Sequence, residues 1–92
     1  MKLDYFLKII DELNKLYSSK APDEEIVCSA NVNGVIYNGI YDNDSFDGKE
    51  MLILNKNYKY DKISKITNKK KSFINISKID SFTYNVNKNI KF

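Results

Sequence analysis

Residues 26–54 read IVCSANVNGVIYNGIYDNDSFDGKEMLIL, and this stretch has the pattern of three consecutive antiparallel strands. Its strongest signal is Asn33-Gly34, which lies between Val32 and Val35. Asn-Gly adopts the positive φ values of a two-residue type I′ turn, the turn that best joins two right-twisted strands. We therefore predict a tight β-hairpin at this point of the chain.

The segments around the turn have strand character. Apolar and polar residues alternate over residues 26–32, which predicts a strand with one face in a core. Residues 35–41 are rich in β-branched and aromatic side chains, and Gly39 among them indicates a sharp bend or a close backbone approach. Residues 42–48 have turn chemistry, so a third strand is expected over about residues 49–54.

The N-terminal region has the pattern of an amphipathic helix over residues 2–18. Apolar residues recur there at steps of three and four, at Leu3, Phe6, Leu7, Ile10, Leu13 and Tyr17. Pro22 and the serines before it end the helix, because the residue before a proline is pushed out of the α region. We expect the apolar stripe to dock on the sheet. If the helix is a free arm instead, the candidate contacts to a protein partner are Leu3, Phe6, Leu7 and Ile10.

The C-terminal half predicts two further strands. Residues 55–57 read as a turn, and residues 61–72 as a polar, lysine-rich loop or hairpin tip. Residues 73–76 and 79–84 have strand character, and a tight turn or a single 3₁₀ turn separates them at residues 77–78.

Length and composition fit one domain, expected over residues 1–84 and followed by a flexible tail over residues 85–92. Cys28 is the one cysteine and lies at an inward position of its strand, so we expect a buried apolar group and no intramolecular disulfide. No signal-like or membrane-spanning apolar run occurs, which predicts an intracellular, cytoplasmic protein with no membrane partner. Five aromatic residues are expected to fill the core: Phe6, Tyr37, Tyr41, Phe73 and Phe82.

The residue types exclude most catalytic chemistry. The chain has no histidine, the commonest general base and metal ligand, and its 3 glycines form no phosphate-binding loop. The carboxylates of Asp42, Asp44, Asp47 and Glu50 resemble a calcium loop only superficially, because their spacing is not that of an EF-hand and strands flank them. We therefore expect a protein that is not an enzyme, with no metal, cofactor or small-molecule substrate.

Charge is unevenly divided along the chain. Residues 1–50 hold 5 Lys and 10 acidic residues, net −5, and residues 51–92 hold 10 Lys and 2 acidic residues, net +8, which together give the chain's +3. The densest basic region surrounds Tyr58 and Tyr60. Tyrosines among lysines can stack on bases while the amines meet phosphate, so one interpretation is a nucleic-acid-binding surface. The alternative is a strand edge kept soluble by lysine.

The layout of one helix and five short strands, with a very tight connection before the last strand, is that of a small bent β-barrel. On two motifs the sequence resembles the Sm and Sm-like (LSm) family. The first motif is matched by Gly34, by Gly39 five residues later, by Ile40-Tyr41, and by the acidic turn and apolar strand that follow. The second, an apolar residue followed at five and eight residues by further apolar positions, is matched by Ile74, Ile79 and Phe82.

This resemblance implies an α+β fold, with the N-terminal helix packed on a five-stranded, strongly bent antiparallel β-barrel of Sm-like or SH3-like type. In RNA-binding members of the family, an Asp and an Asn before the third strand and an Arg-Gly in the second motif form the base pocket. In this chain Asn75 and Ile76 stand in place of Arg-Gly. The loop has no clear Asn at the matching place, and Asn43 and Asp47 are the candidate substitutes. The candidate nucleic-acid-binding residues are Lys56, Tyr58, Lys59, Tyr60, Lys62, Lys69, Lys70, Lys71 and Asn75.

Two functions are compatible with these features. One is a non-catalytic Sm-like RNA-binding or RNP-scaffold protein, expected to form a homo-oligomer if its fourth and fifth strands pair between subunits. The other is a small inhibitor or accessory protein of the phage or mobile-element type, which blocks or sequesters a partner protein. The partner is thus RNA in the first case and another protein in the second.

Overall fold

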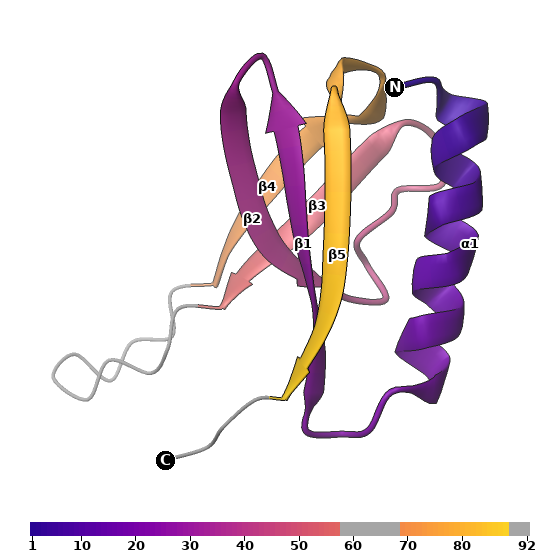
Figure 1. The fold of residues 1–92 in the computed structure, drawn as a ribbon, viewed down its shortest axis with the longest axis vertical. Helices are drawn as coiled ribbons and strands as arrows, with labels where there is room; N and C mark the ends of the chain where they lie inside the picture. The colour runs from indigo at the N-terminus through magenta and orange to yellow at the C-terminus, as the bar shows by residue number, and fades with distance from the viewer. Residues whose placement is uncertain (58–68, 89–92) are drawn as a thin grey trace, which may run out of the picture.

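The computed structural model describes residues 1–57 and 69–88, with the side chains of residues 56–57 and 69–70 left out. It shows one N-terminal helix and a five-stranded antiparallel sheet, which confirms the predicted α+β class (Figure 1). The elements in chain order are α1 (Leu3–Ser19), β1 (Glu24–Val32), β2 (Val35–Tyr41), β3 (Met51–Asn57), β4 (Lys69–Asn75), the 3₁₀ helix η1 (Ile76–Lys78) and β5 (Ser81–Lys88).

The sheet has the strand order β4-β3-β2-β1-β5, and it bends so that its strands lie in two layers (Figure 1). Strands β2, β1 and β5 form a near layer in Figure 1, and β3 and β4 lie behind it. Within the described residues β4 and β5 do not pair with each other, so the sheet is not closed and has two free edges.

The predicted hairpin between β1 and β2 is confirmed. Asn33 and Gly34 have φ values of 52° and 81°, and Val32 pairs with Val35 directly across the turn. Both positive φ values are those that a type I′ turn requires. The turn is also tied to the far end of the chain, because the backbone N–H of Asn33 donates to Oδ2 of Asp80 over 2.8 Å.

Gly39 marks the place where β2 comes closest to β3. A Cβ atom at this position would lie 2.6 Å from the Cβ of Leu54, closer than two such atoms can approach. The paired register between the two strands is short and consists of Ile40 opposite Asn55. The close backbone approach predicted for Gly39 is therefore confirmed, and it lets the sheet bend from the near layer into the far one.

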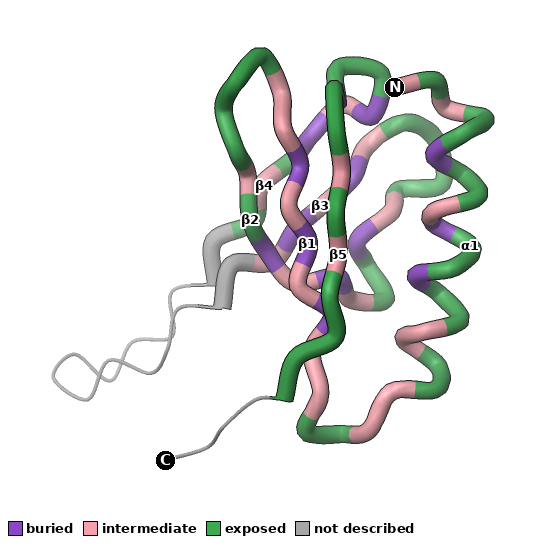
Figure 2. The backbone as a smooth tube through the Cα atoms, in the orientation of Figure 1, coloured by how far each residue is buried: buried purple, intermediate pink, exposed green. Residues whose placement is uncertain are grey.

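The core lies between the two layers of the sheet and α1 (Figure 2). The helix contributes Phe6, Ile10 and Leu13, and the edge of the Phe6 ring meets Phe82 of β5 with ring centroids 5.1 Å apart. The sheet and η1 complete the cluster with Ile26, Cys28, Ala30, Tyr41, Leu52, Leu54, Ile74, Ile76 and Ile79. The helix stripe thus caps the sheet, as predicted.

Three tyrosine hydroxyls hold α1 in place at the edge of this core. Tyr41 donates to Oδ1 of Asn14 and Tyr84 donates to Oε2 of Glu12, each over 2.7 Å. From the helix itself, Tyr17 donates to Oδ1 of Asp42 over 2.8 Å. These bonds fix the position of the helix along the sheet, while apolar burial provides most of the attachment.

Three predicted boundaries in the C-terminal half are wrong. Strand β3 continues through residues 55–57, which were expected to form a turn, and β4 already begins at Lys69, inside the expected polar loop. Asn and Lys have low strand propensity, but pairing between the two strands outweighs it. The last strand reaches Lys88 by pairing with β1, so residues 85–88 are not part of a tail. The predicted 3₁₀ turn is present as η1.

The prediction that Phe73 fills the core is also wrong, since its side chain is 64% exposed. Successive side chains of a strand point to opposite faces, and Ile74 takes the inward position in β4. Phe73 lies opposite Ile53 on the outer face instead.

Within the described residues, no helix combines the length and the apolar character that a membrane crossing requires.

Candidate nucleic-acid interface

The hairpin of β3 and β4 carries a dense set of lysines at the end where residues 58–68 connect the two strands. In its register Lys56 lies opposite Lys70, Asn57 opposite Lys69, and Asn55 opposite Lys71. Directly opposed residues of an antiparallel pair are nearest neighbours across the two strands. Four of the predicted nucleic-acid-binding lysines are thereby brought together on two adjacent strands. Four further candidates lie outside the described residues: Tyr58, Lys59, Tyr60 and Lys62.

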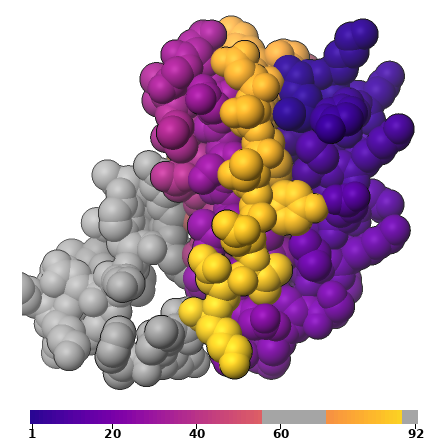
Figure 3. Space-filling model, in the orientation of Figure 1, coloured from indigo at the N-terminus to yellow at the C-terminus, as the bar shows by residue number. Residues whose placement is uncertain are grey.

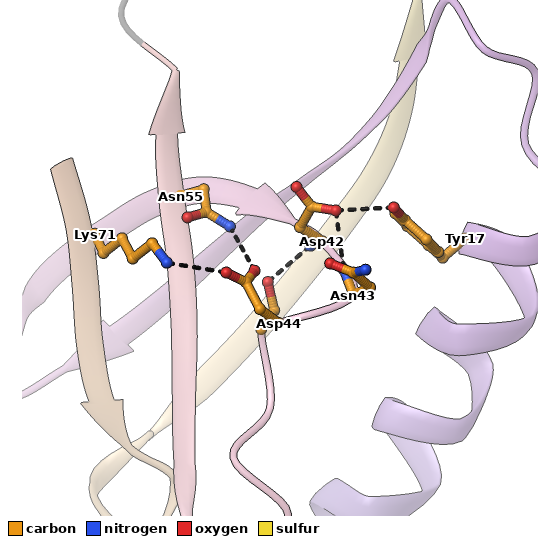
Figure 4. Close-up of polar contacts among 7 residues, drawn as sticks. Tyr17, Asp42, Asn43, Asp44, Asn55 and Lys71 are labelled. Carbon is orange, nitrogen blue, oxygen red and sulfur yellow. Dashed lines mark hydrogen bonds and ion pairs between the residues drawn. The ribbon is translucent and has the colours of Figure 1, made fainter. Parts of the chain in front are cut away.

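One of these lysines has an acidic partner inside the protein (Figure 4). Nζ of Lys71 lies 2.9 Å from Oδ2 of Asp44, and Nδ2 of Asn55 donates to Oδ1 of the same carboxylate over 3.1 Å. The hydrogen bond from Lys71, followed by that from Asn55, lowers the pKa of Asp44. Asp44 therefore joins the β2–β3 loop to the base of the lysine-rich hairpin.

The β2–β3 loop uses its other carboxylates to hold its own shape. Asp42 accepts from the hydroxyl of Tyr17, and its backbone N–H donates to the buried Oγ of Ser45 over 2.7 Å (Figure 4). Oδ1 of Asp47 accepts from three successive backbone N–H groups, those of Lys49, Glu50 and Met51, at 2.8–3.0 Å. The bond from Met51, followed by that from Lys49, lowers the pKa of Asp47. In the part of the chain that the structure describes, no three metal-ligating side chains gather in one place.

The β2–β3 loop and the connection from β4 to η1, where the resemblance to Sm-like proteins predicts a base pocket, lie side by side. The backbone N–H of Ile76 donates to the carbonyl of Glu50 over 2.9 Å, and Asn75 pairs with Met51. However, Oδ1 of Asn75 accepts from the backbone N–H and the hydroxyl of Ser77, at 3.0 and 2.7 Å. Asn75 is therefore the N-cap of η1, and its carbonyl oxygen is engaged within the protein.

The four helix residues predicted as contacts to a protein partner have different environments. Phe6 and Ile10 are in the core and Leu3 packs against it, so these three hold the helix on the sheet. Leu7 differs from them, because its side chain is 40% exposed.

Sequence reasoning did not find the role of Asp44. Lys71 and Asp44 are 27 residues apart, and nothing in the local pattern of either segment connects them. The extension of β4 back to Lys69 brings them together, and the low strand propensity of three consecutive lysines concealed that extension.

Comparisons with known proteins identify no relative of this chain. No family model, no curated protein and no solved structure matches this chain. Its function has to be argued from the arrangement of its own residues.

Proposed function

We propose that the chain is a non-catalytic RNA-binding module of Sm-like organisation, whose lysine-rich β3–β4 hairpin contacts a single-stranded backbone. The observation that carries the proposal is the register that sets Lys56 opposite Lys70, with Lys69 and Lys71 beside them. Adjacent strands are about 4.8 Å apart, so the four lysine positions fall within a short stretch of two neighbouring strands. A cluster of lysine positions on one hairpin suits a phosphate backbone, which proteins bind chiefly through charge.

Three features of the fold support an Sm-like organisation. The helix precedes the sheet, the strand order is β4-β3-β2-β1-β5, and a single 3₁₀ turn connects β4 to β5. The two free edges are then those through which a ring forms, with β4 of one subunit pairing with β5 of the next. Free edges on a small sheet favour such pairing, since it satisfies their backbone hydrogen-bonding groups.

The contacts that Asn75 and Asp47 make within the protein determine what kind of RNA binding we propose. Asn75 and Asp47 are both engaged in turns, and no arginine exists in the chain to stack on a base. Binding through lysines to phosphates carries little sequence information. We therefore propose binding of moderate affinity that depends strongly on salt and weakly on sequence.

The proposal is tested by removing charge from the opposed pair. The Lys56→Gln/Lys70→Gln variant should bind single-stranded RNA more weakly, and its log-log salt slope should be shallower by about 1.4, since each phosphate contact contributes about 0.7. Lys2→Gln/Lys8→Gln is the matched control, because it removes the same charge from the exposed side of the N-terminal segment. If both double variants lose the same affinity and slope, only net charge matters and the hairpin has no special role.

A second pair of substitutions separates stacking from charge. Tyr58→Ala/Tyr60→Ala should lose affinity by about 1–3 kcal/mol per stacked base, with the salt slope unchanged. Tyr5→Ala is the control, since Tyr5 is an exposed tyrosine on the helix. If Tyr58→Ala/Tyr60→Ala bound RNA with unchanged affinity, the affinity would come from the lysines and not from stacking on these tyrosines.

A further inference from the structure

Phe73 is the most exposed large apolar side chain in the part of the chain that the structure describes. It is 64% exposed, although it lies within a paired strand, opposite Ile53. The contacts between aromatic rings among the described residues join Phe6 to Phe82 and Phe82 to Tyr84, and Phe73 takes part in neither. Its ring is therefore accessible to a molecule outside the protein.

Polar and basic side chains flank Phe73 along its strand. Successive residues of β4 alternate between its two faces, so Lys71 and Asn75 share the face of Phe73, and Asn55 of β3 lies opposite Lys71. This strand belongs to the layer behind β5, which is the yellow strand that faces the viewer in Figure 3. A single exposed apolar residue is common on protein surfaces and assigns no role by itself. Here, however, the exposed ring lies beside a lysine, where the lysine-rich end of the hairpin begins.

The spacing of Phe73 and Lys71 suits one nucleotide. Residues two apart in a strand are about 7 Å apart on one face, because each residue rises about 3.4 Å. The base and the phosphate of a nucleotide are also separated by several ångströms, so a base on the ring leaves its phosphate within reach of the flexible lysine. The side chain of Lys71 is 42% exposed while it is paired with Asp44, so phosphate can approach the ammonium group and replace that carboxylate.

The small apolar area on this face favours a nucleobase over a protein partner. Ile53 and Met51, the apolar residues of β3 nearest to Phe73 in the register, are only partly exposed, so the exposed apolar surface is little more than one ring. A standard protein interface buries about 800 Å² on each partner. A base stacks on a single ring, and every base has a π-face, so stacking requires neither a larger patch nor a particular sequence. The adjacent lysine provides the charge that a phosphate requires.

We propose that Phe73 is a base-stacking residue, on which one base of single-stranded RNA stacks while the neighbouring phosphate contacts Lys71. This inference rests on the proposed function and adds a contribution that charge alone does not provide. Stacking on an aromatic side chain strengthens binding roughly 5- to 150-fold per base. The protein should therefore prefer a polymer that carries bases to a phosphate polymer that has none.

Removing the ring tests the inference through affinity. Phe73→Leu keeps an exposed apolar side chain and removes the π-face, so labelled single-stranded RNA should bind at least about fivefold more weakly, with an unchanged salt slope. Inorganic polyphosphate, which has charge and no bases, should bind the parent protein and this variant equally in calorimetric titrations. Tyr5→Leu is the matched control, because Tyr5 is 60% exposed on α1, and it should leave both affinities unchanged. An equal loss for RNA and polyphosphate would overturn the inference, since Phe73 would then act on the shape of the hairpin.

A tryptophan at the same position reports stacking directly. The chain has no tryptophan, so Phe73→Trp provides a single indole emission, which a stacked base quenches. We expect quenching by RNA and none by polyphosphate, while Tyr5→Trp is quenched by neither. An emission of Phe73→Trp that changes with protein concentration and not with RNA would identify this face as a contact between copies of the chain and would overturn the inference.

These measurements separate this inference from the proposed function. If the parent protein binds RNA while Phe73→Leu binds it equally well and Phe73→Trp is not quenched, the stacking role is overturned and the proposed function stands. If the parent protein binds no RNA below about 100 μM, both are overturned.

Discussion

Nζ of Lys71 lies 2.9 Å from Oδ2 of Asp44, and this ion pair connects the edge strand β4 to the β2–β3 loop. One lysine of the basic hairpin is thus neutralised within the protein, while Asn55 steadies the same carboxylate. In our account Asp44 competes with phosphate for Lys71.

Asp44→Asn should therefore bind single-stranded RNA more tightly than the parent protein, with a log-log salt slope steeper by about 0.7, because one more lysine is free to meet phosphate. Stability should change by less than about 1 kcal/mol, since the pair is exposed to solvent and screened. Fluorescence anisotropy over a salt series and urea denaturation measure the two quantities. Weaker binding by Asp44→Asn would mean that Asp44 positions the hairpin for RNA and does not compete with it.

The helix stripe gives a matched pair of truncations. Ile10 is 4% exposed and Leu7 is 40% exposed, although sequence periodicity alone predicts a cost of roughly 2–4 kcal/mol for truncating either. We expect Ile10→Ala to reduce the free energy of unfolding by about 2–5 kcal/mol and Leu7→Ala by less than about 1 kcal/mol. Thermal and urea unfolding of both variants check this difference. Equal losses would show that α1 is rotated relative to the structure.

The type I′ turn predicts a backbone effect at Gly34. Its φ of 81° is strained for a β-branched side chain, although a Cβ there would meet no other atom within 4 Å. Gly34→Val should lower the free energy of unfolding by more than about 1 kcal/mol through backbone strain alone. Urea denaturation is the measurement, and a loss of only a few tenths of a kcal/mol would indicate another turn type.

Burial of the single thiol predicts a pH effect. Desolvation raises the pKa of Cys28 from 9.0 to about 12, so its thiolate is disfavoured in the folded protein. A pKa raised on folding gives stability that is complete below pH 9 and is lost as the pH rises from about 9 to about 12.

Below pH 9, iodoacetamide should modify Cys28 much faster in urea than under native conditions. Equal rates in the two conditions would place the thiol at the surface. Cys28→Ala should lose less stability than the parent between pH 9 and pH 12.

The parts of the fold that could be predicted are those that depend on local chemistry. Asn33-Gly34 specifies its turn because few other residue pairs tolerate two consecutive positive φ values. Gly39 predicted a close approach because a glycine within a strand is typical of one, and in the structure a side chain there would meet Leu54. The helix was recognisable from its stripe of buried residues.

The parts that could not be predicted depend on pairing between distant segments. Residues 69–72 have the composition of a loop and become a strand only because β3 lies beside them. Phe73 faces outward because the phase of β4 is set by Ile74, which a single aromatic residue in a short strand does not reveal. The Lys71–Asp44 pair depends on the β3–β4 register, so no single segment contains its signal.

The most direct test of the central claim, that the β3–β4 hairpin binds single-stranded RNA, is fluorescence anisotropy of the parent protein with labelled U-rich and A-rich RNA near physiological salt. Nonspecific binding to nucleic acid has dissociation constants of about 10⁻⁴ to 10⁻⁶ M under such conditions. The account predicts binding of both RNAs within this range, with similar affinity and strong weakening as salt is added. Absence of binding below about 100 μM would contradict it and would leave recognition of a protein partner as the function to test.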